Sequence, residues 1–126
     1  MTRRETVEAV GALTEALETT ERARGHLYSF HQLTGSADMK LGRAVELLRE
    51  AGHVALADQL DHELVGRNVL PGRWTYQIVE EYDDSYYQVF RDLEKLVRNK
   101  LLDGARHIFE AEMKKERTTP GHPDHV

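Results

Sequence analysis

Residues 66–75 read Gly66-Arg67-Asn68-Val69-Leu70-Pro71-Gly72-Arg73-Trp74-Thr75, the one irregular stretch between segments of helical patterning. It holds the only tryptophan and the only proline ahead of the C-terminal residues 118–126. Residues 70–73 fit a type II turn, with proline in the second position and glycine in the third. Thr75 has the position of an N-cap for the helix that follows. The stretch therefore separates a part with short helices from a part with one very long helix.

The composition limits the class of protein. The 126 residues suit a single domain, placed at 1–117, and a loose tail at 118–126 that holds two prolines and a glycine. A net charge of −5 without clustered basic residues argues against nucleic acid or an anionic membrane as a partner. No apolar run is long enough to span a bilayer, and there is no cysteine for disulfides or thiolate chemistry. We expect a cytoplasmic protein.

Helical spacing of apolar residues precedes the irregular stretch. It predicts a first helix at about residues 5–33, although the apolar stripe nearly vanishes between 18 and 25. Gly35 is expected to end this helix. A second helix at about 37–50 and a third reaching residue 65 follow, joined by a tight glycine-containing turn. These two helices are predicted to form an αα-hairpin.

A long helix is predicted after the irregular stretch, from Tyr76 to about Arg117. At about 1.5 Å per residue it would extend roughly 60 Å, further than the hairpin can cover. Two places could break it: Ser85 and Gln88 have capping-box spacing, and Gly104 is a weak helix former. The fold class is therefore all-α, a bundle of about four helices with a central hairpin. The stripe that this helix should bury follows alternating spacings of three and four: Val79, Tyr82, Tyr86, Val89, Leu93 and Leu96.

Charge is unevenly distributed along this predicted helix. Residues 77–94 carry six acids and one arginine, whereas residues 95–117 carry seven basic residues and four acids. Acids near a helix N-terminus and bases near its C-terminus suit the helix dipole, which accounts for most of the pattern. The same asymmetry would let two copies pair in antiparallel fashion. Because the helix exceeds its own partners in length, we expect a homodimer.

The irregular stretch also offers a candidate binding surface. Arginine guanidinium groups recognise carboxylate or phosphate in bidentate fashion, and an indole provides a flat apolar wall. An alternative is purely structural: the tryptophan packs at the helix start, and the arginines pair with Glu80, Glu81 or Asp61. Two tyrosines of the buried stripe could border a cleft. The candidate binding residues are Arg67, Arg73, Trp74, Tyr76, Tyr82 and Tyr86.

A divalent metal site is a second possibility. Histidine and carboxylate groups three or four residues apart share one helix face, as metal sites in bundles require. The ferritin-like signature, Glu-x-x-His on two helices with a Glu on each of two others, is absent, and so is the His-Glu-x-x-His of zinc proteases. Surface histidines and helix ion pairs explain the same spacings. The candidate ligands are Asp58, His62, Glu81, His107 and Glu110.

Two stretches are informative together: residues 41–53 read LGRAVELLREAGH, and residues 65–77 read VGRNVLPGRWTYQ. They resemble a family of small, uncharacterised actinobacterial proteins that are all helical. The resemblance extends over roughly residues 25–117. No activity is attached to that family, so the resemblance implies neither a reaction nor a cofactor nor site residues.

The sequence as a whole favours binding over catalysis. No nucleophile elbow, phosphate-binding loop or dinucleotide fingerprint occurs. We expect a non-catalytic, self-associating helical interaction protein without a cofactor, whose partner is another copy, a further protein or a small anionic ligand. The alternatives are a His/carboxylate metal protein or metal-dependent enzyme, and a binder of small anions through Arg67, Arg73 and Trp74.

Overall fold

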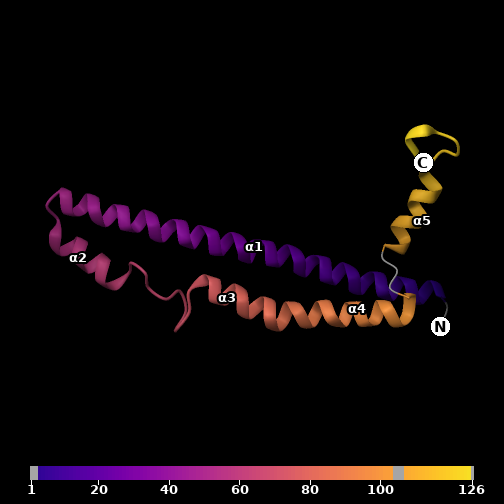
Figure 1. Ribbon diagram of the computed structural model, residues 1–126, viewed down its shortest axis with the longest axis horizontal. Helices are drawn as coiled ribbons and strands as arrows, with labels where there is room; N and C mark the ends of the chain where they lie inside the picture. The colour runs from indigo at the N-terminus through magenta and orange to yellow at the C-terminus, as the bar shows by residue number, and fades with distance from the viewer. Residues whose placement is uncertain (1–2, 104–106, 126) are drawn as a thin grey trace. The chain divides into compact units, whose positions relative to one another are not determined.

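The fold is all-α. The computed structural model describes residues 3–103 and 107–125, and these contain helices but no β-strand (Figure 1). None of the described helices combines the length and the hydropathy needed to span a bilayer. In chain order the elements are α1 (Arg3–Glu50), α2 (Val54–Glu63), α3 (Thr75–Tyr82), the π-helix η1 (Asp83–Tyr87), α4 (Gln88–Leu102), α5 (Ile108–Arg117) and the 3₁₀-helix η2 (Pro123–His125).

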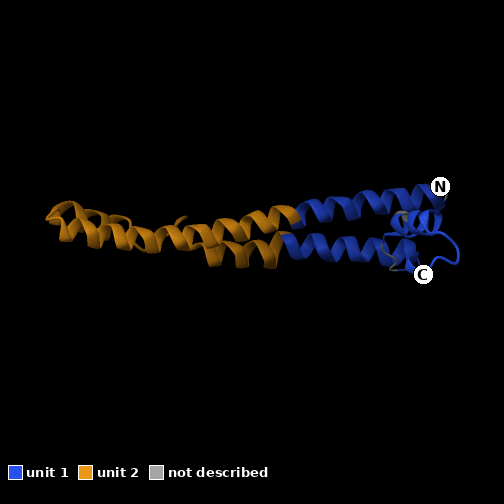
Figure 2. Cartoon of the chain, turned by 90° about the horizontal axis from the view of Figure 1, so that it is seen from above, with its two compact units in different colours: residues 1–21, 87–126 blue, residues 22–86 orange. Residues whose placement is uncertain are grey.

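Two compact units divide the chain (Figure 2). Unit 1 consists of residues 1–21 and 87–126, and unit 2 of residues 22–86. In unit 1, α4 lies beside the N-terminal part of α1; in unit 2, α2 and α3 lie beside the rest of α1 (Figures 1 and 2). The chain passes between the units within α1, after residue 21, and within η1, after residue 86; the predicted domain boundary at residue 117 lies inside unit 1.

The first helix is longer than predicted. Gly35 does not end it, because α1 continues without interruption from Arg3 to Glu50. The predicted separate helix at 37–50 is therefore wrong; these residues form the end of α1. Gly35 is not among the glycines with positive φ, so it lacks the left-handed geometry of a C-terminal stop. It is a helical glycine whose missing side chain faces open space.

Polar contacts replace apolar packing where the predicted stripe of α1 thins out. In unit 1 the Thr14 hydroxyl donates to Glu94 at 2.7 Å, and the Tyr87 hydroxyl donates to Glu21 at 2.8 Å. Residues 14 and 21 lie seven positions apart, which keeps them near one face of the helix. Around residue 18, α1 therefore contacts α4 and η1 through hydrogen bonds. Apolar periodicity in the sequence does not reveal such contacts.

The same pattern continues in unit 2. Three α1 side chains seven residues apart meet the returning chain: Arg24 pairs with Asp83 at 2.7 Å, His31 Nδ1 lies 2.6 Å from Thr75 Oγ1, and Asp38 accepts the Gly66 N–H at 2.9 Å. His31 and Thr75 are half-buried and buried, respectively. Thr75 therefore belongs to this polar seam and is the first residue of α3, while Trp74 occupies the N-cap position predicted for Thr75.

The turn after α1 lies where the sequence predicts it. Gly52 takes a φ of 87°, a left-handed value that favours glycine, and the chain then reverses into α2 (Figure 1). Arg49 at the end of α1 pairs with Asp58 of α2 at 2.5 Å, and Ala57 is buried. The helix ends at Glu63, two residues earlier than expected.

The predicted helix from 76 to 117 is wrong as a single element. The π-helix η1 interrupts it, α4 ends at Leu102, and Asp103 follows with a φ of 52°. Gly104, the expected weak point, lies outside the described residues. At the other weak point Ser85 forms no capping box; its hydroxyl donates to the Glu81 carbonyl four residues back. Such back-bonding by serine competes with the helix ladder and perturbs it locally.

The π-helix changes which face of α4 is buried. A π-turn closes i to i+5 and holds one more residue than an α-turn, so the helix beyond it is rotated by one residue position. The residues one position after the predicted stripe are accordingly buried or half-buried: Tyr87, Phe90, Glu94 and Val97. The stripe itself is turned outward, at 58% exposure for Tyr86, 55% for Val89, 53% for Leu93 and 46% for Leu96. The prediction that this stripe is core is therefore wrong from Tyr86 onward, whereas Val79 is buried and Tyr82 half-buried.

The apolar core is small. In unit 1 a cluster of buried side chains joins Val7 and Val10 of α1 to Leu102 at the end of α4. Val97 and Ile108 pack against it. In unit 2 the buried apolar residues are Val45, Ala57 and Val79. Several of the contacts between α1 and later parts of the chain are therefore polar side-chain contacts.

Candidate functional site

A hollow beside Trp74 brings together part of the predicted binding surface. Its volume is about 290 Å³, and it lies in unit 2 between α1 and the irregular stretch. We call it the Trp74 hollow. Its lining residues are Thr34, Gly35, Asp38, Met39, Gly66, Arg67, Val69, Trp74 and Thr75. The α1 members of this set were not identified from the sequence, because they lie in a region interpreted as the junction between two helices.

Local hydrogen bonds shape the irregular stretch. Gly66 has a φ of 71°, its N–H donates to Asp38, and its carbonyl accepts the Trp74 indole N–H at 3.1 Å. The turn predicted at residues 70–73 is present: the Arg73 N–H donates to the Leu70 carbonyl, and Gly72 has a φ of 74°. These bonds fix the indole beside α1 while leaving it 48% exposed.

The two arginines of the stretch have different surroundings. Arg73 forms an ion pair with Glu81 at 3.0 Å, which is the structural role that the sequence offered as an alternative. Arg67 lines the Trp74 hollow, and its Nη1 donates to the Glu63 carbonyl at 3.4 Å. Within residues 3–103 and 107–125 no carboxylate lies within ion-pair distance of Arg67. Arg67 is therefore the arginine available to an anion.

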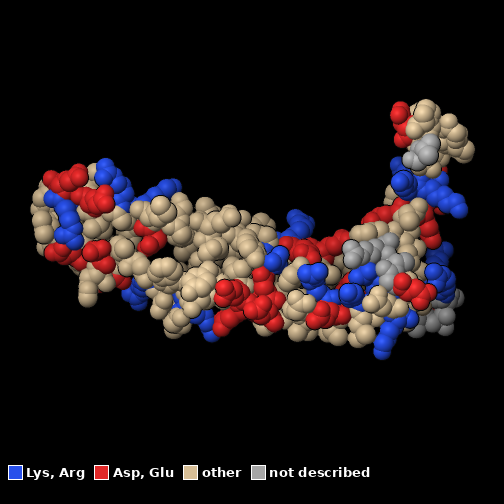
Figure 3. All heavy atoms as spheres, viewed as in Figure 1, with Lys and Arg blue, Asp and Glu red and all other residues tan. Residues whose placement is uncertain are grey.

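The predicted tyrosines lie outside the hollow. Tyr76 is exposed near the start of α3, and it is absent from the lining. Tyr82 and Tyr86 stack with ring centroids 5.8 Å apart, and Tyr86 is exposed. Acidic side chains gather on the surface near these rings, where Figure 3 shows red atoms over α3 and η1. The aromatic and arginine candidates thus do not form one site.

The five candidate metal ligands do not come together at one site. Asp58 is paired with Arg49, and Glu81 with Arg73. His107 lies 2.5 Å from Glu110 in unit 1, whereas His62 is on the exposed surface of α2 in unit 2. Among the described residues no three histidine or carboxylate side chains gather as a metal site would require.

A cluster around Asp83 was missed by sequence reasoning. The Arg24 guanidinium holds both carboxylate oxygens, at 2.7 and 3.0 Å, and the Tyr28 hydroxyl donates to the second oxygen at 2.9 Å. The hydrogen bonds from Arg24, and then that from Tyr28, lower the pKa of Asp83 although partial burial opposes them. The hydrogen bond to Asp83 is the main cause of a raised pKa for Tyr28. Asp83 lies 59 positions from Arg24 and 55 from Tyr28 in the sequence, so no local pattern predicts that these three residues meet.

A buried ion pair in unit 1 was likewise not anticipated. Glu94 and Arg98 of α4 are both buried, and Arg98 Nε lies 3.2 Å from each Glu94 carboxylate oxygen. The Thr14 hydroxyl also donates to Glu94. A spacing of four residues is visible in the sequence, but only the one-residue rotation caused by η1 brings this pair inward.

Comparison with other proteins adds no relative. No protein-family model matches this sequence, and neither a curated protein nor a solved structure proved significantly similar to it. The family resemblance of residues 41–53 and 65–77 therefore stays a prediction. What can be inferred about function rests on the geometry described above.

Proposed function

We propose that this chain is a non-catalytic helical interaction protein that associates with a second copy of itself through α4. The single observation that carries the proposal is the outward-facing apolar ridge of that helix. We define the ridge by Val89, Leu93 and Leu96, each close to half exposed. The opposite face of the same helix buries Glu94 and Arg98. A helix that buries charge and exposes leucine has its usual amphipathic pattern reversed.

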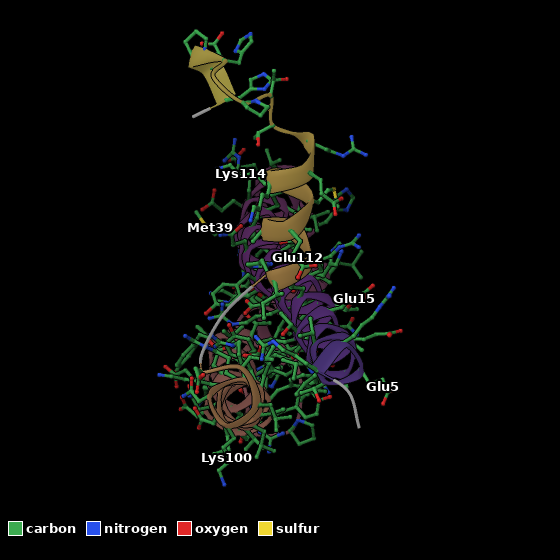
Figure 4. All side chains as sticks on the ribbon, turned by 90° about the vertical axis from the view of Figure 1, so that its right-hand side faces the viewer. Glu5, Glu15, Met39, Lys100, Glu112 and Lys114 are labelled. Carbon is green, nitrogen blue, oxygen red and sulfur yellow. The ribbon has the colours of Figure 1, made fainter. Side chains whose placement is uncertain are left out.

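The direction of the ridge supports this proposal. Lys100 follows Leu96 by four residues, which places both on nearly the same side of α4. In Figure 4 the Lys100 side chain points away from α1 into solvent. The ridge therefore faces away from the chain's own α1, on a side where a partner can approach.

The spacing of the ridge favours a helix of the same kind as its partner. Val89, Leu93 and Leu96 are four and three residues apart, the alternation that packs two helices along a common seam. An apolar ridge is complementary to itself, so the same ridge of a second copy can cover it across a two-fold axis. Burying a fully exposed leucine is worth about 1.5–3 kcal/mol, so each half-exposed ridge residue would gain roughly half of that, and a symmetric interface covers the ridge of both copies.

Substitution of the central ridge residue tests the proposal. Leu93→Glu places a carboxylate at the middle of the seam, and in a two-fold interface it faces its own copy. The wild-type chain should sediment at twice 14.5 kDa, and Leu93→Glu should sediment as a monomer. Leu33→Glu is the matched control because Leu33 is an exposed leucine of unit 2, whereas the ridge belongs to unit 1; it should leave the dimer intact.

A crosslinking experiment provides a second measurement. The chain has no cysteine, so Leu93→Cys introduces a single thiol. Mild oxidation should give a covalent dimer in high yield, whereas Leu33→Cys should give little. A wild-type chain that remains monomeric at concentrations of tens of micromolar, or Leu93→Glu with an unchanged mass, would contradict self-association through α4.

A further inference from the structure

Arg67 lines two hollows of unit 2 at once. One is the Trp74 hollow; the other, of about 460 Å³, lies between the end of α1 and α2. We call the second the leucine hollow, and its lining residues are Leu48, Leu56, Gln59, Leu60, Glu63, Leu64 and Arg67. We propose that Arg67 and these two hollows bind a small monocarboxylate with an apolar body, the guanidinium taking the carboxylate and a hollow taking the body.

The apolar walls of both hollows are unusually open to water. Met39 is 80% exposed, Leu56 59% and Trp74 48%. Large apolar side chains around a concave surface that also holds a few polar groups are the usual composition of small-molecule sites. A ligand body that covers these side chains removes apolar surface from water, which is favourable in proportion to the area covered.

Arg67 is the one cationic side chain in the described lining of the two hollows, against two carboxylates. The carboxylates that line them are Asp38 and Glu63. Asp38 Oδ1 already accepts the Gly66 N–H, and Glu63 Oε2 accepts the Gln59 side-chain amide at 3.4 Å. The Arg67 guanidinium has five N–H donors, and the bond to the Glu63 carbonyl uses only one. Two parallel N–H donors are therefore available to hold a carboxylate in bidentate geometry.

The anionic head group distinguishes the proposed ligand from an alcohol or an amine with the same apolar body. A neutral alcohol with the same body would cover the apolar walls but could form neither an ion pair nor a bidentate pair of hydrogen bonds with Arg67. A cationic amine would gain nothing from Arg67 and would have to pair with Asp38 or Glu63 instead. The order of affinity among three molecules that differ only in their head group therefore reports on the proposed chemistry.

Trp74 provides the readout because it is the only tryptophan of the chain. The full-length protein is titrated with octanoate, octanol and octylamine, below their micelle concentrations, while indole fluorescence is followed. Octanoate should bind most tightly, by roughly tenfold over octanol, since hydrogen bonds to a charged group add that order of affinity. Octylamine should bind more weakly than octanoate; binding as tight as that of octanoate would show that Asp38 or Glu63 takes the head group instead of Arg67.

Two arginine variants locate the site. Arg67→Gln should weaken octanoate binding roughly tenfold and leave octanol binding unchanged. Arg73→Gln is the matched control, because Arg73 belongs to the same loop but is occupied by Glu81; it should bind octanoate like the wild type. Arg67→Lys keeps the charge without the bidentate fork and should fall in between. Circular dichroism of each variant establishes that the helices are retained.

Several results would overturn the proposal. Octanol binding as tightly as octanoate would show that no cation takes part. Equal losses in Arg67→Gln and Arg73→Gln would place the anion elsewhere. If Arg67→Gln fails to fold, the octanoate-to-octanol ratio of the wild type and of Arg67→Lys still decides. Because the hollows lie in unit 2 and Leu93 lies in unit 1, we expect Leu93→Glu to bind octanoate with wild-type affinity. This result would separate the ligand site from self-association.

Discussion

Two carboxylates, Glu94 in unit 1 and Asp83 in unit 2, have the same kinds of hydrogen-bond partner but differ in burial. In unit 1, Glu94 receives an arginine and a hydroxyl, Arg98 and Thr14. In unit 2, Asp83 also receives an arginine and a hydroxyl, Arg24 and Tyr28. The side chains of the first ion pair are 4% and 9% exposed, those of the second 22% and 30%. Burial is thus the variable that separates two otherwise similar clusters.

This difference sets what each cluster can contribute. Exposed or half-exposed ion pairs contribute little, because water screens the charges and the side chains lose freedom. A buried pair gains from the lower dielectric but has lost the solvation of both charges, so removing only one partner is costly. The buried pair therefore specifies how α4 faces α1 more than it adds net stability.

Removal of one member of the buried pair should have the largest effect. Glu94→Ala leaves the Arg98 guanidinium buried without its carboxylate, and the free energy of unfolding should fall by about 3–5 kcal/mol. Urea denaturation followed by circular dichroism measures this loss. The double variant Glu94→Leu with Arg98→Met should recover most of it, because the charge and its solvation cost disappear together. A cost for Glu94→Ala no larger than that for Asp83→Asn would erase the contrast.

The half-exposed cluster should give a smaller effect that depends on pH. The lowered pKa of Asp83 means that its ionised form stabilises the folded chain. That stability is fully present above the ordinary pKa of 3.8 and is lost as pH falls through the lower folded value. Asp83→Asn should therefore lower the free energy of unfolding by about 1 kcal/mol or less at neutral pH. It should also reduce the loss of stability of the folded chain at acidic pH. Denaturation series at several pH values check it, with Asp84→Asn as the control at the adjacent residue.

A glycine pair should give the smallest change and tests the continuity of α1. Gly35 is helical with open space around it, so Gly35→Ala should stabilise the chain by about 0.5–1 kcal/mol. Gly52 has a positive φ, so Gly52→Ala should destabilise it by about 1 kcal/mol. Thermal melting compares the two. Destabilisation by Gly35→Ala would mean that the helix stops there after all.

The sequence predicts the all-α class, the turn before α2 and the irregular stretch. Each has a local signal: helical periodicity, a glycine in a tight turn, or the proline–glycine pair at residues 71 and 72. The continuity of α1 and the orientation of α4 were not predictable in this way. Both depend on contacts between distant residues, such as Arg24 with Asp83, and on an irregular helical turn that apolar spacing does not reveal.

The candidate site was predictable only in part. Arg67 and Trp74 are recognisable by residue type and by their place in a loop. Arg73 has the same residue type and lies in the same loop, but it pairs with Glu81 and does not line either hollow. Met39 and Asp38 enter the hollow because α1 continues past Gly35, so the error about that helix concealed half of the site.

The π-helix η1 also governs which changes of chain length the protein tolerates. Deleting one residue from 83–87 would turn the wide turn into an ordinary α-turn, and Tyr87 and Glu94 would keep their side toward α1. Adding one residue would instead swing everything beyond it by about 100° and break the contact of Glu94 with Thr14. Loss of one residue from η1 would therefore preserve the contacts of α4 with α1, whereas gain of one residue would not.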